Sequence, residues 1–415
     1  MRGVEEIPAP VGDPLPLPLQ IFASRDHFSK IAGFNGAQIN ASRGCNGSCT
    51  YCNYSTLKRL EYREAKELKM SITAKKNCNI GRSKIRNVNT VCDEISQLWH
   101  EQKVRYFSFI DKQLLPDNQN SAIDFLDSLK SGIETRGVKN FRYGLILRGE
   151  NLTEKIIDKA AETGLVNCFV NIGFGTQDEG LLFKRKIDHE IILKMINHLN
   201  NMGVATEAKL IFIHPYSTLN SIKKALLLLK FINHTSLELT SMRVLYKTTL
   251  YNNLKREGRL IGNPFGYSYI FEDKQVERFS KIFSKLRDDA FKNFALSSKI
   301  KNLFINIAMG QTLFGDKKVK WIELELKILQ KNLNRLYIDV FEEALNIVQN
   351  SSEEKELEKL IYFAKCKSGN LLSKIQELEL LVEHSVNKQQ EKSNELLIKN
   401  YSFVSTYKNP VVNNF

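Results

Sequence analysis

The feature that most restricts the fold of this chain is a repeated alternation between short apolar runs and amphipathic helical segments. Six runs predict strands, and they lie at residues 37–43, 104–111, 141–147, 168–174, 206–214 and 237–245. Between them, apolar side chains recur every three or four residues, which is typical of helices with one buried face. This α/β order predicts parallel strands joined by right-handed crossovers, in a barrel or in an open sheet.

The alternation stops after Asn263-Pro264, which marks the expected end of the barrel or sheet. Beyond this point, long charged segments have the periodicity of amphipathic helices, and they cover residues 277–295, 320–349 and 353–397. Residues 1–30 are rich in proline and lack periodicity, as expected of a linker or a strap. We therefore predict a strap over 1–30, a barrel or sheet over 31–262 and an all-helical region over 263–415.

The composition excludes several classes of protein. Of 415 residues, 42% are hydrophobic and 26% are charged, as in ordinary globular proteins. No apolar run reaches the roughly 18 residues that a transmembrane helix needs. The early acids and prolines do not fit a signal peptide, and seven cysteines are too few for a disulfide scaffold. We therefore expect a cytoplasmic protein without membrane association.

Positive charge is concentrated in the first part of the chain. The net charge is +14, and residues 1–262 carry 37 basic and 26 acidic side chains. The densest stretch, 58–86, has ten Lys and Arg against three Glu. Such a stretch can hold nucleic acid, an acidic peptide or an anionic cofactor, although a solvated basic face is the simpler interpretation.

The chemically informative stretch begins at Ala41, at the end of the first predicted strand, and reads ASRGCNGSCTYC. Its three thiols are spaced C-x3-C-x2-C on a loop with two glycines, and they can bind one soft metal centre. A structural zinc site usually has four protein ligands. However, Cys78 lies 26 residues beyond Cys52, and the nearest histidine is His27. Three ligands would leave one position open, and a zinc-binding or incidental trio is the alternative.

This motif resembles the signature of the radical S-adenosylmethionine (SAM) superfamily, in which three cysteines hold a [4Fe-4S] cluster and SAM binds the fourth iron. The resemblance implies that Cys45, Cys49 and Cys52 are the cluster ligands and that Tyr51 lies beside the adenine of SAM. It also implies a partial (β/α)6 barrel, which agrees with the six strands predicted from periodicity.

The resemblance extends over roughly residues 5–260. The second predicted strand resembles its counterpart in the family, which ends in an acid near SAM, here Asp111. The end of the third resembles the segment in which an arginine contacts the carboxylate or ribose of SAM, here Arg148. Thr176, after the fourth strand, is also expected to contact SAM. His214, after the fifth, is a candidate proton donor or substrate contact, although a structural role is the simpler expectation.

Two features depart from the family pattern. Gly175 stands where the subgroup usually has an acid, and the usual glycines around Pro215 are missing, so we expect an altered SAM pocket or a divergent substrate. The segments ASRGC and EEIPAP resemble a subgroup with an N-terminal cobalamin-binding domain, which would have to precede Met1. We expect that cobalamin is not used. A separate chain that supplies it, or a truncated reading frame, are the alternatives.

The resemblance predicts an oxygen-sensitive enzyme that cleaves SAM reductively to a 5′-deoxyadenosyl radical, with an electron from an external flavodoxin- or ferredoxin-like donor. The radical would take hydrogen from a small-molecule or peptide substrate, and methylation, cyclisation or rearrangement would follow. One alternative is a divergent or truncated cluster-binding protein that needs a partner chain for activity. Another, suggested by the basic excess in residues 1–262, is an RNA-modifying radical SAM enzyme. The sequence assigns no catalytic residue.

Overall fold

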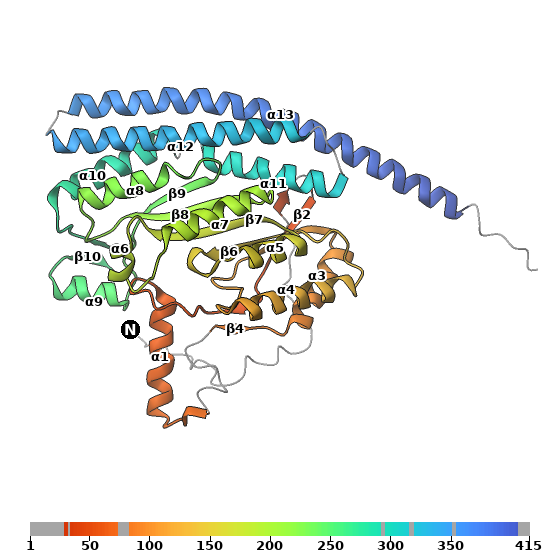
Figure 1. Ribbon diagram of the computed structural model, residues 1–415, viewed down its shortest axis with the longest axis horizontal. Helices are drawn as coiled ribbons and strands as arrows, with labels where there is room; N and C mark the ends of the chain where they lie inside the picture. Colours follow the sequence, from red (N-terminus) through yellow and green to blue (C-terminus); the bar gives the residue numbers. More distant parts are fainter. Residues whose placement is uncertain are drawn as a thin grey trace, which may run out of the picture.

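A seven-stranded sheet forms the centre of the structure, a computed structural model that describes residues 29–31, 34–73, 83–291, 295–314, 319–350 and 354–405. Its parallel strands curl into a half-barrel (Figure 1) and are β2 (Phe34–Ile39), β5 (Val104–Phe109), β6 (Tyr143–Arg148), β7 (Leu165–Phe174), β8 (Ala205–Ile213) and β9 (Ser236–Ser241). The short strand β1 (Ser29–Ile31) pairs antiparallel with β2 at one edge, and β9 forms the other edge. The predicted partial (β/α)6 barrel is thereby confirmed.

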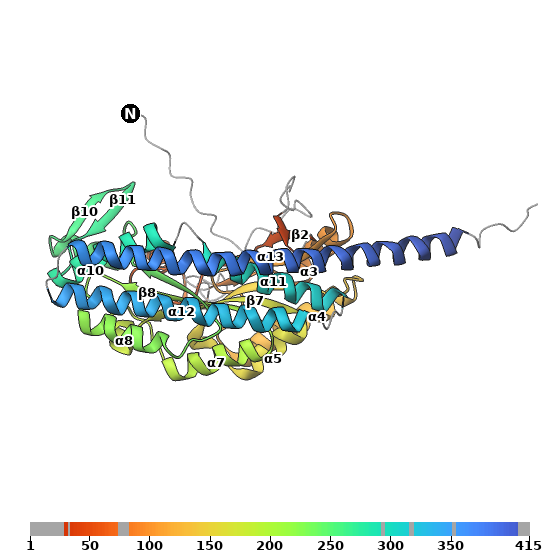
Figure 2. The same ribbon diagram turned by 90° about the horizontal axis from the view of Figure 1, so that it is seen from above.

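Helices connect consecutive strands and cover one face of the sheet (Figures 1 and 2). They are α3 (Val88–His100), α4 (Gln119–Glu134), α5 (Glu154–Thr163), α7 (His189–Asn201) and α8 (Leu219–Leu229). Each follows a residue whose side chain accepts a hydrogen bond from the first turn, namely Asn87, Asn118, Thr153, Asp188 and Thr218. The strand–helix order explains the parallel pairing, because each crossover returns the chain to the same end of the sheet.

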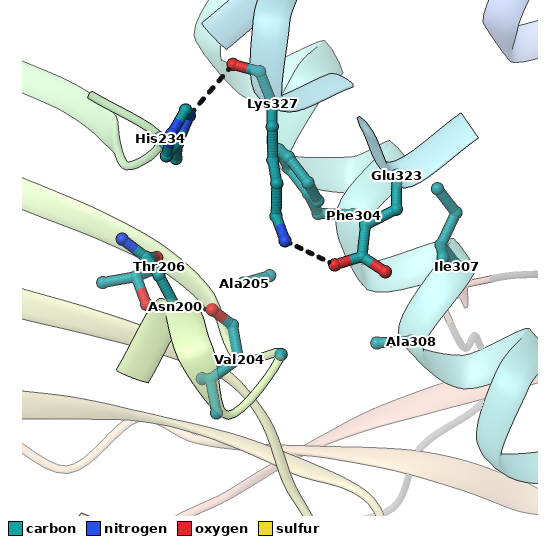
Figure 3. A pocket seen from close by; sticks show the side chains of 11 residues that line it. Asn200, Val204, Ala205, Thr206, His234, Phe304, Ile307, Ala308, Glu323 and Lys327 are labelled. Atoms are coloured by element: carbon teal, nitrogen blue, oxygen red, sulfur yellow. Dashed lines mark hydrogen bonds and ion pairs between the residues drawn. The ribbon is translucent and has the colours of Figure 1, made fainter. Parts of the chain in front are cut away.

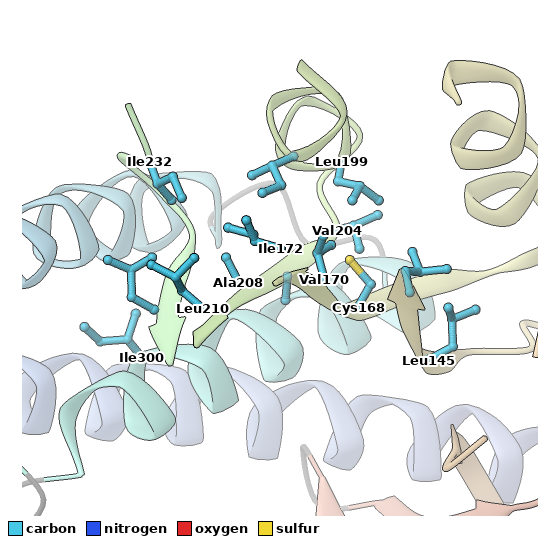
Figure 4. Close-up of a cluster of buried hydrophobic side chains, with 14 of the residues drawn as sticks. Leu145, Cys168, Val170, Ile172, Leu199, Val204, Ala208, Leu210, Ile232 and Ile300 are labelled. Atoms are coloured by element: carbon cyan, nitrogen blue, oxygen red, sulfur yellow. The ribbon is translucent and has the colours of Figure 1, made fainter. Parts of the chain in front are cut away.

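The face of the sheet beneath these helices carries the apolar core (Figure 4). Every second residue of a strand points to this face, and the buried side chains there include Leu145, Cys168, Val170, Ala208 and Leu210. Cys92 in α3 and Cys168 in β7 are both fully buried free thiols. Burial raises the pKa of Cys168 to about 12, so this thiol stays neutral and packs as an apolar group.

The helical region begins later than the sequence predicts. Strands β10 (Leu260–Asn263) and β11 (Gly266–Tyr269) form an antiparallel hairpin, so the predicted boundary between residues 262 and 263 falls inside a strand. The helical elements that follow are α10 (Lys274–Leu286), the short π-helix η2 (Arg287–Phe291), α11 (Leu296–Phe314), α12 (Val319–Gln349) and α13 (Glu354–Ser405). Periodicity does not predict α11, because this helix packs between the sheet and α12 and α13 and has no single apolar face.

The helical region packs against the barrel and shares its core. Helix α11 contacts β7, β8 and β9, and α12 contacts α8. Helices α12 and α13 lie side by side, and α13 extends beyond α12 in both views (Figures 1 and 2). Phe212 of β8 is 2% exposed, and its ring centroid lies 5.5–6.1 Å from those of Phe279, Phe283 and Phe341. Among the described residues, no helix combines the length and the apolar character needed to cross a membrane.

Candidate functional site

The three cysteines of the motif lie on the loop that follows β2 and leads into helix α1 (Asn53–Glu67). All three are free thiols and are partly exposed. The short strand β3 (Ser42–Arg43) begins this loop and pairs with β4 (Lys84–Ile85). At the other end of the loop, the N–H of Cys52 donates to the carbonyl oxygen of Cys49 at 3.2 Å. The thiols therefore lie at the carboxyl ends of the parallel strands, the edge where parallel barrels place their sites.

Asp111, which the resemblance places near SAM, holds the beginning of this loop. It is 2% exposed, and its carboxylate accepts hydrogen bonds from the backbone N–H of Ala41, at 3.1 Å and 3.2 Å, and from that of Ser42. The carbonyl oxygen of Gln113 accepts from Ser42 Oγ at 3.0 Å, and its side chain accepts from the N–H of Asn46 at 2.8 Å. Burial raises the pKa of Asp111, and its hydrogen bonds with Ala41 and Ser42 offset part of the rise. Its contact with SAM stays a prediction.

Arg148, at the end of β6, lies against the first cysteine of the motif. Its Nη1 donates to Sγ of Cys45 at 3.3 Å, and its Nε and Nη2 donate to Oε1 of Glu150 at 3.1 Å and 2.6 Å. The N–H of Gly47 also donates to Sγ of Cys45, at 3.3 Å, so this sulfur accepts two hydrogen bonds. A Cβ on residue 47 would lie 2.3 Å from Nη1 of Arg148. Glycine therefore lets the loop approach the arginine this closely.

Arg185, between α6 (Gln177–Leu182) and α7, is a site residue that sequence reasoning missed. Its side chain is 3% exposed, and its Nε and Nη2 donate to the two carboxylate oxygens of Glu150 at 3.1 Å and 2.7 Å. It also donates to the side chain of Asn171 in β7, at 3.1 Å, and to its carbonyl oxygen. Burial acts to raise the pKa of Glu150, but Arg185 and Arg148 hold that pKa below its usual value. In the sequence, Arg185 stands in a Lys-Arg-Lys run that resembles any charged surface.

Tyr51 connects the second cysteine of the motif to Arg185. Its hydroxyl group lies close enough to the thiol of Cys49 and to the guanidinium group of Arg185 to interact with both. Its ring meets those of Phe174 and Phe183 edge-on, with centroid distances of 5.7 Å and 5.8 Å. Burial raises the pKa of Cys49, although two nearby arginines oppose this rise. Phe174 and Phe183 are at most 1% exposed, so Tyr51 packs against a buried apolar surface. The expected position of Tyr51 beside the adenine of SAM stays a prediction.

Thr176 and His214 meet at a glutamate that sequence reasoning also missed. Thr176 precedes α6, and its hydroxyl group accepts from the N–H of Glu179 at 3.2 Å. The fully buried His214 lies with Nε2 2.8 Å from Oε1 of Glu179. A Cβ on Gly175 would lie 2.3 Å from Cβ of Ala225 in α8, so close helix packing explains the glycine where the family pattern has an acid. The contacts of Thr176 and His214 with SAM or substrate stay predictions.

The structure thus joins Cys45 to Arg148 and Cys49 to Tyr51, and it links both pairs through Glu150 and Arg185. Cys78 and part of the basic stretch, residues 74–82, lie outside the described residues. Within the described ranges, no group of three or more His, Cys, Asp or Glu side chains is arranged to hold a single metal ion.

Two cavities lie at the opposite end of the barrel from the cysteine loop. One, of about 40 Å³, is lined by residues that include Val204, Ala205, Thr206, His234, Phe304 and Lys327 (Figure 3). The other, of about 290 Å³, lies between the first residues of β8 and β9 and the helices α10, α11 and α12. Because both adjoin the amino ends of β8 or β9, they are separate from the candidate site.

Comparison with known proteins identifies the fold. No family model matches the sequence, and no curated protein matches it significantly. The cobalamin-dependent SAM radical enzyme OxsB, solved with aqua-cobalamin and SAM bound, aligns with a TM-score of 0.53 and 13% identity over 88% of this chain and 56% of its own. OxsB with aqua-cobalamin aligns with a TM-score of 0.50 and 12% identity over 80% of this chain and 58% of its own. The chain has a radical SAM fold. It spans little more than half the length of the OxsB structures.

The residues at the carboxyl edge of this radical SAM fold suit a [4Fe-4S] cluster. Three thiols on one short loop are the donors that such clusters use. The cysteines of a cluster bind different irons and stand farther apart than the ligands of one ion, so a ready-made single-ion site is not required. The hydrogen bonds from Gly47 and Arg148 to the sulfur of Cys45 are contacts of the kind that orient metal ligands.

Proposed function

We propose that this chain is a radical SAM enzyme in which Cys45, Cys49 and Cys52 hold a [4Fe-4S] cluster. The observation that carries the proposal is the position of these three free thiols on one loop at the carboxyl edge of a radical SAM fold. The chemistry that a bound cluster supplies is the transfer of one electron to SAM, which releases methionine and a 5′-deoxyadenosyl radical that takes hydrogen from a substrate.

In this proposal, the chain's own residues bind and orient SAM and exclude water from the site. Arg148 supports binding of the SAM carboxylate, because its guanidinium group lies beside Cys45 and arginine binds carboxylates with paired hydrogen bonds. The rings of Tyr51, Phe174 and Phe183 pack beside Cys49 and exclude water from that side of the loop, which protects a reactive radical from side reactions.

The partners of the reaction belong to the same proposal. The electron donor is a flavodoxin- or ferredoxin-like protein, and the substrate is a small molecule or a peptide that undergoes methylation, cyclisation or rearrangement. OxsB is a cobalamin-dependent enzyme. For this chain we propose radical formation without cobalamin, so the first assay omits cobalamin and a second assay adds it.

The test uses the full chain, purified without oxygen and reconstituted with iron and sulfide. Iron and sulfide are counted, dithionite and SAM are added, and 5′-deoxyadenosine is measured by chromatography. We expect about four irons per chain and deoxyadenosine formation. Both should be lost in the triple variant Cys45→Ala, Cys49→Ala, Cys52→Ala. The matched control is Cys366→Ala, which removes an exposed thiol of α13 and should change neither result.

Each other outcome selects an alternative. A complete cluster without deoxyadenosine, with or without cobalamin, would favour a divergent cluster-binding protein that needs a partner chain. One tightly held zinc ion and no iron would contradict the proposal, as would equal iron contents in the triple variant and the wild type.

A further inference from the structure

A single carboxylate, Glu150, holds two arginines beside the cysteine loop. Its Oε1 accepts from Nη2 and Nε of Arg148 at 2.6 Å and 3.1 Å and from Nε of Arg185 at 3.1 Å. Its Oε2 accepts from Nη2 of Arg185 at 2.7 Å. The side chains of Glu150, Arg148 and Arg185 are 15%, 18% and 3% exposed. Both arginines are thus fixed in direction, and little water screens their charges.

The two arginines serve different cysteines. Arg148 directs Nη1 at Sγ of Cys45, at 3.3 Å. Arg185 lies beside the hydroxyl group of Tyr51 and acts electrostatically on both Tyr51 and Cys49. Two positive charges and one negative charge therefore adjoin two of the three proposed cluster ligands.

Such an arrangement acts on the reduction potential of a bound cluster. Net charge, hydrogen bonds to the sulfur atoms and exposure to water determine the potentials of iron–sulfur clusters. Reduction adds one negative charge, so hydrogen-bond donors and positive charges at the sulfur atoms stabilise the reduced state more than the oxidised state.

We propose that Glu150 is a positioning residue that holds Arg148 against Cys45 and Arg185 near Cys49, and thereby raises the reduction potential of the cluster bound there. The inference rests on the proposed function, because it requires a cluster on these thiols. It assigns a purpose to Arg185, which is buried too deeply to serve as an ordinary surface charge.

A merely electrostatic or structural role for Glu150 predicts a different result. If the carboxylate acts only as a negative charge near the cluster, its neutralisation favours reduction and raises the potential. If it acts by holding the arginines, its neutralisation releases their contacts and lowers the potential. If it serves only the fold, stability changes and the potential does not. The sign of the change therefore separates the three roles.

The test is a redox titration of the full, anaerobically reconstituted chain, followed by the electron paramagnetic resonance signal of the reduced cluster. Glu150→Gln is expected to lower the ratio of reduced to oxidised cluster about tenfold at a fixed potential, which equals about 59 mV for a one-electron couple. Arg148→Lys keeps the charge but loses the forked contact, and it should shift the potential in the same direction. Glu238→Gln is the matched control: it removes a carboxylate that is paired with Lys209 at 2.8 Å, and it should leave the potential unchanged.

Iron content and thermal unfolding are measured for each variant, so that a failure to fold is recognised. If Glu150→Gln fails to fold, the milder variant Arg148→Lys still tests the inference. A raised or unchanged potential in Glu150→Gln overturns the inference, as does an unchanged potential in Arg148→Lys. If the wild type binds no iron, the proposed function itself fails. If iron binds normally and the potentials of all variants agree, only the present inference fails.

Discussion

Replacing Gly47 by alanine should move Arg148 away from Cys45 without unfolding the protein. The added Cβ would lie 2.3 Å from Nη1 of Arg148, whereas ordinary van der Waals contact begins at 3.4 Å. The guanidinium group must therefore retreat by about 1.1 Å, the difference between these distances. Its Nη1 now lies 3.3 Å from Sγ of Cys45, so a retreat of this size along that line removes the hydrogen bond.

The magnitude follows from the value of one hydrogen bond. A net contribution of about 0.5–1.5 kcal/mol corresponds to about 20–60 mV for a one-electron couple, since a tenfold change is about 1.4 kcal/mol or 59 mV. We expect the midpoint potential of the bound cluster to fall by this amount in Gly47→Ala. The free energy of unfolding should change by less than about 1 kcal/mol, because the contact is with the end of a flexible side chain and a loop alanine lowers the entropy of the unfolded chain.

Two measurements on the same variant check this reasoning. The potential is obtained by redox titration of the reconstituted protein, and stability by urea denaturation of the cluster-free protein. Gly266→Ala is the control, because a Cβ at this hairpin position meets open space. An unchanged potential at full iron content would refute the link between the Arg148 contact and the cluster. A loss of several kcal/mol would show that Arg148 cannot move aside.

Three further predictions concern the fold. Gly164→Ala should lower the free energy of unfolding in urea by about 2–5 kcal/mol, because its φ is 111° and a Cβ would lie 2.0 Å from a backbone carbonyl oxygen. Gly203→Ala, with φ of 74° and open space, should cost only about 1–2 kcal/mol, and equal losses would contradict the steric argument. Burial acts to raise the pKa of Glu179, but its histidine partner holds that pKa below the usual 4.5. The stabilisation by Glu179 is therefore present above pH 4.5 and lost as the pH falls through the lower folded-state pKa. Glu179→Gln should flatten that part of a stability–pH curve, and an unaltered slope would count against the contact. Phe212→Ala should cost about 3–5 kcal/mol in the same denaturation assay, whereas the fully exposed Phe265 should tolerate alanine to within about 0.5 kcal/mol; similar losses would show that Phe212 does not join the two regions.

The sequence predicted the parts of the structure that are recorded in local patterns. Strands such as β5 and β8 are short segments rich in apolar residues, so the sequence pattern predicts their positions. The cysteine loop was recognised because C-x3-C-x2-C is a strict spacing. The end of β6 could be located because Arg148 directly follows an apolar run, and the structure places its guanidinium group at Cys45.

The remaining features depend on distant contacts. Glu150 and Arg185 are 35 positions apart and meet only after β7 has paired with β6. Gly175 looks like the loss of an acid until α8 is seen to pack against it at Ala225. The hairpin of β10 and β11 is largely exposed, so its residues lack the buried alternation by which strands are predicted.

The cysteine loop is tied down by groups that are not cysteines. Asp111 holds its beginning, and Lys58 donates from Nζ to the carbonyl oxygens of Asn46 and Gly47. The N–H of Thr50 donates to the carbonyl oxygen of Phe183, and the carbonyl oxygen of Thr50 accepts from the N–H of Leu250. Contacts that involve none of the three thiols thus define much of the backbone conformation of this loop. Under the proposed function, binding of a cluster should therefore require little additional ordering of this part of the chain. For the same reason, loss of the proposed cluster should leave the loop in a conformation that can be refilled without refolding of the chain.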